Sequence, residues 1–188
     1  MLFERIISEG LAHYSYLIGD GETAMVIDPR LDCEVYVAKA SQAGMRIAYV
    51  FETHRNEDYV VGSAELAART GAQVWHADAE MAYEYGAPAA DGQSWEIGGY
   101  RLEAMATPGH TPGSIALYLD TPDGRVLFGQ DVHGPFLPEF DSNIEQWRLS
   151  MEKLLALEAD ILCEGHYGVY RGKEEVARYI RSQLTANS

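Results

Sequence analysis

The chain has 188 residues, of which 47% are apolar and 11% aromatic, and its formal net charge is −15. These proportions are typical of a globular protein and argue against a disordered chain. The negative charge argues against nucleic acid and anionic membrane surfaces as partners, because both need a basic face. No apolar run reaches the ~18 residues of a membrane span, and Met1 to Gly10 lack a signal-peptide core, so we expect a cytoplasmic protein.

The expected order is strands, helix, strand, helix, then a run of strands, helix, strand and helix, with a hairpin turn at Gly19 to Gly21. The strongest helix signal covers residues 143–157, where apolar side chains recur at i, i+3 and i+4 spacing. The expected helices are residues 34–43, 63–69, 77–85, 143–157 and 173–184. The expected strands are residues 3–7, 14–18, 23–27, 45–51, 73–75, 94–97, 100–106, 114–120, 125–128 and 160–163.

This order of elements predicts two β-sheets with helices on their outer faces. The sequence contains no repeat of fixed period and no linker long enough to divide domains. The predicted fold class is therefore α/β (α+β), with four αββα layers in a single domain over residues 1–188.

The two cysteines, Cys33 and Cys163, do not make a disulfide framework. Each is more typical of a small core or loop residue than of a nucleophile. Cys163 is the better candidate nucleophile of the two, because it lies three residues before His166.

Four turns at expected strand ends carry side chains that bind metals or transfer protons. Glycine and proline make three of these turns tight, and a tight turn presents its side chain at the fixed angle that a metal site needs. A single histidine is more often structural, and we expect that of His13 and His76, which lack this context. The four turns contribute, in chain order, His54 with Asp58, then His110, Asp131 and His166.

These motifs resemble those of the metallo-β-lactamase superfamily, and the resemblance implies the four-layer αββα sandwich. Residues 12–30 look most like the branch that contains persulfide dioxygenases and glyoxalase II. The matching segments are Glu52-Thr53-His54 with Asp58, Thr107-Pro108-Gly109-His110-Thr111-Pro112-Gly113-Ser114, Phe128-Gly129-Gln130-Asp131, and Gly165-His166.

The metal motif departs from the family pattern His-x-His-x-Asp-His, since Asn56 and Tyr59 stand where the family has its second and third histidines. A standard dinuclear zinc pair would therefore lack one imidazole at each ion. His54, His110 and Asp131 remain, and two histidines with one carboxylate form the facial triad of mononuclear Fe(II) oxygenases. The resemblance to persulfide dioxygenases implies that these three residues hold Fe(II), with Zn(II) or Mn(II) as the alternative.

Residues around this triad are expected to support it. Asp58, Tyr59 and His166 are the predicted catalytic residues, which would orient ligands or act as acid or base. Asp58 and His166 are also candidate additional ligands.

His133 is a further candidate ligand, because on a strand it would face the same side as Asp131 and supply a missing imidazole. The alternative is a loop histidine at the pocket rim. Gln130 takes the place of a family glycine, and Glu164, where relatives often have proline, has no explanation in the sequence.

The predicted function is a mononuclear non-haem Fe(II) oxygenase acting on a small thiol or persulfide substrate. One alternative is a thioester or ester hydrolase, similar to glyoxalase II, with an altered dinuclear site. Another is a non-catalytic relative that binds a metal or ligand. Replacement of the histidines at Asn56 and Tyr59 favours the oxygenase over the hydrolase. The expected partner is a small-molecule substrate, and a homodimer is compatible with the sequence.

Overall fold

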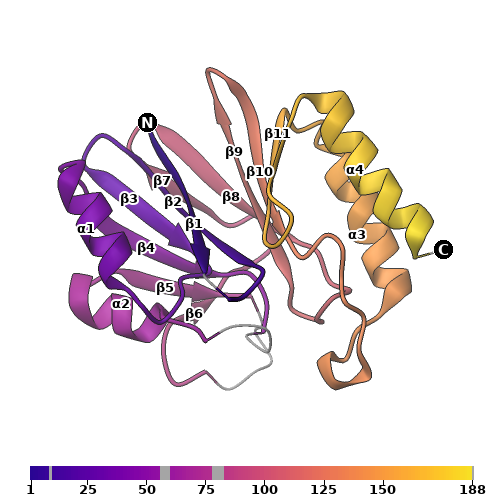
Figure 1. Cartoon of the computed structure of the whole chain (residues 1–188), viewed down its shortest axis with the longest axis horizontal. Helices are drawn as coiled ribbons and strands as arrows, with labels where there is room; N and C mark the ends of the chain where they lie inside the picture. Colours follow the sequence, from indigo (N-terminus) through magenta and orange to yellow (C-terminus); the bar gives the residue numbers. More distant parts are fainter. Residues whose placement is uncertain (9, 56–59, 78–82, 188) are drawn as a thin grey trace.

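A computed structural model describes residues 1–8, 10–55, 60–77 and 83–187 (Figure 1). Its first sheet has six strands, ordered β1-β2-β3-β4-β5-β6. Strands β1 to β3 pair antiparallel and β3 to β6 pair parallel. Helix α1 (Glu34–Gln42) joins β3 to β4, and helix α2 (Ser63–Thr70) joins β4 to β5. The strands are β1 (Leu2–Ser8), β2 (His13–Asp20), β3 (Thr23–Ile27), β4 (Arg46–Glu52), β5 (Gln73–His76) and β6 (Ala87–Pro88).

The second sheet has six strands, ordered β12-β11-β10-β9-β8-β7. Only β10 and β11 pair parallel in it, and α3 (Ile144–Ala156) makes their crossover. A 3₁₀ turn at Pro138–Phe140 precedes α3, and α4 (Lys173–Ala186) ends the chain. The strands are β7 (Ser94–Ile97), β8 (Tyr100–Ala106), β9 (Ile115–Thr121), β10 (Gly124–Gln130), β11 (Ile161–Glu164) and β12 (Val169–Arg171).

Three apolar layers hold these elements together, and they confirm the predicted αββα order. Alternation along the strands creates the layers, since neighbouring side chains point to opposite faces. On β2, Tyr16 and Ile18 face the core between the sheets, whereas Leu17 faces α1 and α2. A third cluster, which includes Leu127 and Trp147, lies between the second sheet and helices α3 and α4. Figure 1 shows one pair of helices outside each sheet.

Most predicted elements are confirmed within two or three residues, with three differences. The hairpin turn is Gly21-Glu22, because Asp20 still pairs with Thr23. Ala77 and residues 83–85, at the two ends of the predicted helix 77–85, are not helical, and residues 78–82 lie outside the described residues. Strands β6 and β12 were not predicted, because such short strands give no periodic signal.

The parallel pairing of strands β3 with β4 and β10 with β11 brings the candidate turns together at one edge of each sheet. Asp28 follows β3 and His54 follows β4, whereas Asp131 follows β10 and His166 follows β11. Since the carboxyl ends of parallel strands meet at the same edge, each pair of turns is brought together there.

Hydrogen bonds then join the two sheets at this edge. The backbone N–H of Ile115 donates to the carbonyl of Thr53 at 2.8 Å, and that of Tyr14 donates to the carbonyl of Gly165 at 2.6 Å. Within the described ranges, no helix has both the length and the hydropathy needed to cross a bilayer.

Candidate metal centre

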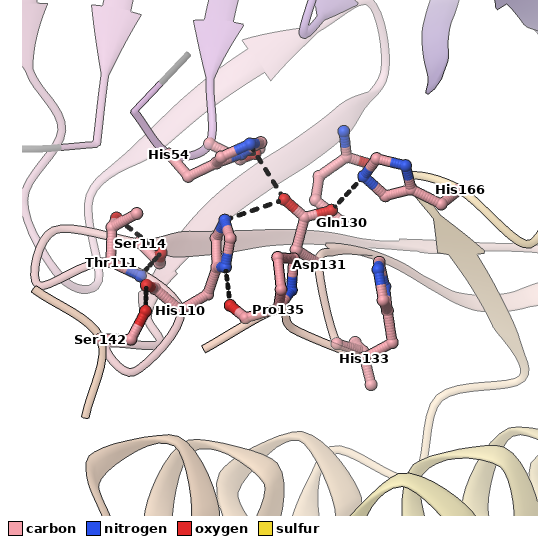
Figure 2. A network of polar contacts seen from close by, with 12 residues as sticks. His54, His110, Thr111, Ser114, Gln130, Asp131, His133, Pro135, Ser142 and His166 are labelled. Carbon is pink, nitrogen blue, oxygen red and sulfur yellow. Dashed lines mark hydrogen bonds and ion pairs between the residues drawn. The ribbon is translucent and has the colours of Figure 1, made fainter. Parts of the chain in front are cut away.

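Asp131 lies among three imidazoles (Figure 2). Its Oδ2 is 2.9 Å from Nε2 of His54 and 3.4 Å from Nε2 of His110. Its Oδ1 is 2.7 Å from Nε2 of His166. The side chains of Asp131, His54 and His110 are at most 5% exposed, and that of His166 is 15% exposed. The structure therefore brings together the three predicted metal ligands and His166.

The environment of Asp131 fits a cation. Burial raises the pKa of its carboxyl, but the neighbouring His54 and His166 more than offset this and hold that pKa well below its ordinary value. Among the described residues, neither carboxylate oxygen accepts a hydrogen bond of regular geometry. A buried carboxylate that faces imidazole nitrogens matches the donor set of a transition-metal site.

Hydrogen bonds on the far side of each ring set the tautomers of His54 and His110. Nδ1 of His54 is 2.9 Å from Oγ1 of Thr53. The Thr53 hydroxyl donates its own proton to Oδ2 of Asp28 at 2.7 Å, so Nδ1 must be the donor to it. Nδ1 of His110 is 2.7 Å from the carbonyl oxygen of Pro135, which can only accept. In the neutral rings both Nε2 atoms therefore carry a lone pair toward Asp131, as metal ligands require.

Asp28 is a supporting residue that no sequence motif predicted. It is fully buried, and burial raises the pKa of its carboxyl despite its hydrogen bonds. Its oxygens accept from the backbone N–H and hydroxyl of Thr53 and from the side-chain amide of Gln130. The carboxylate thus fixes both residues, one beside His54 and one beside Asp131. Its position directly after β3, the parallel neighbour of β4, is the sequence signal that could have placed Asp28 beside the turn of His54.

The loop that carries His110 packs against the start of α3. Gly109 has φ +146°, and a Cβ on it would lie 2.3 Å from Cα of Trp147. Its carbonyl accepts from the backbone N–H of Asn143, whose side chain caps α3 by accepting from two backbone N–H groups. Glycine at position 109 is therefore required by this close approach.

Gln130 occupies a left-handed backbone position, with φ +43°. That conformation explains why relatives have glycine there, because glycine adopts it without steric cost. In this chain the side chain of Gln130 instead donates to Asp28.

A second group of ligands adjoins the first. Asp131, His133 and His166 each offer one ligand atom, and these atoms lie within 4.8 Å of one another. His133 joins them from a turn, since β10 ends at Gln130, so strand alternation does not explain its direction. Its role as a ligand stays a prediction.

Glu164 now has a structural explanation. Its Oε1 is 2.7 Å from Nδ1 of His133. Its Oε2 accepts from the backbone N–H groups of His166 at 2.6 Å and Tyr167 at 2.7 Å. The carboxylate is completely buried and holds both histidines of the second group.

A small cavity adjoins the first group of ligands. The ring of Phe140 packs edge-on against His110, with centroids 5.5 Å apart, and so places an apolar side chain beside the centre. The cavity is lined by Thr53, His54, Thr107, His110, Ser114, Ile115, Gly129, Gln130, Asp131, Trp147 and Met151.

The remaining predicted residues fall into two sets. Asp58 and Tyr59, together with Asn56, lie outside the described residues, so their catalytic roles stay predictions. His13 and His76 lie outside both groups of ligands: Nδ1 of His13 is 3.0 Å from Oγ of Ser8, and His76 stacks on Tyr83.

Neither cysteine is placed to act as a nucleophile. Both thiols are buried, and Cys163 belongs to the apolar core between the sheets. Burial raises the pKa of the Cys163 thiol, so the reactive thiolate is disfavoured.

The amino-acid sequence is similar to those of known proteins. A family model, the metallo-beta-lactamase superfamily, matches residues 9–166. The hydroxyacylglutathione hydrolase of Acidiphilium cryptum is 31% identical over 160 residues, which cover 82% of this chain and 65% of that protein. The mitochondrial persulfide dioxygenase ETHE1 of Bos taurus is 33% identical over 134 residues, which cover 63% of this chain and 47% of that protein. The chain therefore spans less than two thirds of the length of these two relatives.

Solved structures share the fold. ETHE1 from Myxococcus xanthus aligns with a TM-score of 0.81 at 24% identity, covering 96% of this chain and 90% of that one. A metallo-beta-lactamase from Staphylococcus aureus subsp. aureus COL aligns with a TM-score of 0.81 at 25% identity, covering 100% and 62%.

Proposed function

The chain belongs to the metallo-beta-lactamase superfamily, and we propose that it is a mononuclear non-haem Fe(II) oxygenase acting on a small thiol or persulfide substrate. The observation that supports this most is the convergence of His54 and His110 on one oxygen of Asp131. Two histidines and a carboxylate are the ligand set of such oxygenases. When bound, Fe(II) would supply open coordination positions for O₂ and for the substrate sulfur. Similarity to proteins named persulfide dioxygenase supports the same proposal.

The surrounding residues would orient the ligands for a metal ion. Thr53 and the Pro135 carbonyl hold the Nδ1 protons of His54 and His110, so neither ring needs to reorient to bind a metal. Ile115, Trp147 and Met151 give the small cavity beside the ligands an apolar wall. His166 lies on the other oxygen of Asp131, where it fixes the orientation of the carboxylate.

A second candidate is a metal-dependent hydrolase of a thioester or ester. It is favoured by one specific observation: Oδ1 of Asp131 faces His166, and His133 lies beside it. A carboxylate shared between two ions is suited to hydrolysis at a two-metal centre. Relatives named hydroxyacylglutathione hydrolase support this candidate. It requires a second ion, whereas the oxygenase requires only the first group of ligands.

Metal content and O₂ consumption together test the proposal. We expect protein produced in iron-supplemented medium to contain about one iron per chain and to consume O₂ when a low-molecular-weight persulfide is added. His54→Ala should lose both the iron and the O₂ uptake. His76→Gln, which removes an imidazole outside both groups of ligands, should keep both.

Three other results would contradict the proposed oxygenase or its ligands. Two zinc ions per chain with thioesterase activity and no O₂ uptake would replace the oxygenase by the hydrolase. Absence of firmly bound metal would favour a non-catalytic binding protein. A His54→Ala variant that keeps its iron would overturn the ligand assignment.

A further inference from the structure

We propose that a surface groove at one edge of the first sheet binds an uncharged alkyl or aryl group, which is the organic part of the substrate. The inference rests on the proposed function and adds a substrate class to it, namely an alkyl or aryl thiol or persulfide. The groove has a volume of about 540 Å³, within the range of small-molecule sites. It is lined by Ile7, Ser8, Leu11, Arg30, Leu31, Asp32 and Val60.

Apolar side chains dominate the lining of the groove. Its four large apolar residues are between 48% and 64% exposed, and they come from three separate segments of the chain. These residues are Ile7, Leu11, Leu31 and Val60. Single exposed apolar residues are normal on a protein surface, whereas several gathered in one hollow are typical of a binding site. An apolar group that enters the groove would remove both surfaces from water, which favours binding.

The groove lies at the edge of the first sheet that carries the candidate ligand His54. Strands β1 and β3 both pair antiparallel with β2, so β1 runs in the same direction as β3 and β4. Ile7 near the carboxyl end of β1 therefore lies at the same edge as His54, which follows β4 (Figure 1). Arg30 lies two residues after Asp28, whose carboxylate holds Thr53 beside His54. This position suits the organic group of a substrate whose sulfur is bound at the metal.

Hydrogen bonds hold the three segments of the groove together. The N–H of Leu31 donates to the carbonyl of Val60 at 2.9 Å. A Cβ at Gly62 would collide with the carbonyl oxygen of Arg30, so glycine is needed for this approach. The Arg30 guanidinium donates to the carbonyl of Ile7 at 2.7 Å and so joins the third segment to the other two. The segments are thus joined before any ligand arrives, which lowers the entropic cost of binding.

The charges of the groove favour an uncharged group. Arg30 is the only cation among the described residues that line it, and its guanidinium already binds the carbonyl of Ile7 and, at 3.2 Å, the carboxylate of Asp32. These opposite charges leave the groove close to neutral, in a chain whose net charge is −15. An anionic group would have to displace Asp32 and would be repelled by the chain as a whole. Glutathione, which carries ionised carboxylates, therefore fits the groove poorly, whereas a plain alkyl or aryl group fits it.

Methyl-group NMR of the zinc-loaded protein tests binding without any reaction, and zinc avoids the signal broadening that Fe(II) causes. Added 1-hexanol should shift the methyl signals of Ile7, Leu11, Leu31 and Val60, whereas S-methylglutathione should not. From 1-propanol to 1-hexanol, affinity should rise about two- to fourfold for each added methylene, the upper value being that of complete burial.

Two leucine variants test whether the groove is the site. Leu31→Ser should weaken the binding of 1-hexanol about fivefold or more. In assays of O₂ uptake it should raise the KM for hexyl persulfide by a similar factor while the iron content stays unchanged. Leu149→Ser is the matched control and should change neither value, because Leu149 is similarly exposed, at 61% against 54%, but lies on α3.

The outcomes separate this inference from the proposed function. Shifts of the groove methyl signals that depend on Leu31, without O₂ uptake on any persulfide, would support the groove and overturn the oxygenase. O₂ uptake with equal KM for methyl and hexyl persulfide, without such shifts, would overturn the groove and leave the oxygenase intact. Equal affinity of Leu31→Ser and wild type for 1-hexanol would also overturn the groove.

A further outcome concerns a different occupant. Analytical ultracentrifugation shows whether the wild type is a dimer that Leu31→Ser dissociates. Such a dimer, together with no binding of 1-hexanol, would assign the groove to a second copy of the chain and overturn the inference.

Discussion

Nδ1 of His133 donates to Oε1 of Glu164 across 2.7 Å, and this contact links the turn after β10 to the last residue of β11. Glu164 is completely buried, and both of its oxygens are used. Burial of a carboxylate is costly unless it is hydrogen-bonded, and the three hydrogen bonds of Glu164 offset this cost while they position their partners. A comparable arrangement lies on the other side of the centre, where Asp28 holds Thr53 beside His54.

Loss of the Thr53 hydroxyl should weaken the first metal site. Thr53→Val keeps the shape of the side chain but leaves Nδ1 of His54 without its acceptor and Asp28 without one donor. We expect metal affinity to fall by about 10- to 100-fold and the free energy of unfolding to fall by about 1–3 kcal/mol. Equilibrium dialysis and urea denaturation measure the two effects. Thr53→Ser keeps the hydroxyl and should stay close to wild type in both; equal losses in the two variants would contradict the role of the hydroxyl.

Substitution of Gly109 should displace His110. In Gly109→Ala the new methyl group would lie 2.3 Å from Cα of Trp147, so the loop or α3 must move. We expect a loss of about 1–3 kcal/mol in the free energy of unfolding, together with weaker binding of the first metal ion. Gly99→Ala is the control, because a Cβ there meets its nearest neighbour at an ordinary 3.5 Å. Normal metal affinity in a destabilised Gly109→Ala would show that the loop position does not govern His110.

Neither cysteine should react in the folded protein at mildly alkaline pH. Burial raises the pKa of the Cys163 thiol above its ordinary value, so the folded state keeps the protonated, unreactive form as pH rises past the range where a free thiol ionises. A disulfide reagent such as DTNB should label Cys33 and Cys163 only after denaturant is added. Cys163→Ala should retain the O₂ uptake of the wild type. Rapid labelling of native Cys163, or loss of activity in that variant, would restore it as a candidate nucleophile.

Removal of the metal should lower the melting temperature. A ligand at about 100 times its dissociation constant stabilises the folded state by about 2.7 kcal/mol. For a chain of this size that corresponds to about 5–10 °C in melting temperature. Calorimetry with and without a chelator measures the shift, and His54→Ala should show little of it. A chelator-induced shift of full size in that variant would place the stabilising ion elsewhere.

The parts of the fold and site that were predicted from sequence are those with local signals. The Thr-Pro-Gly-His segment predicted the position of His110, and apolar spacing predicted α3. The roles of Asp28 and Glu164 were not predicted, because their partners Gln130 and His133 are 102 and 31 residues away along the chain. Parallel pairing of β10 with β11 brings Glu164 to His133, whereas the packing of one sheet on the other brings Asp28 to Gln130. His133 was a candidate for a local reason, strand alternation, yet a turn and a distant carboxylate orient it.

The hydrogen bonds between the sheets hold the backbone beside two of the candidate ligands without the help of a bound cation. The N–H of Ile115 binds the carbonyl just before His54, and the N–H of Tyr14 binds the carbonyl just before His166. The Tyr16 hydroxyl adds a third bond, to the carbonyl of Glu164 at 2.6 Å. These bonds involve no ligand atom, so the backbone at Thr53 and Gly165 is held in place before any ion arrives, and binding there need not be coupled to folding. The amide protons of Tyr14 and Ile115 should therefore exchange slowly with solvent whether or not metal is present.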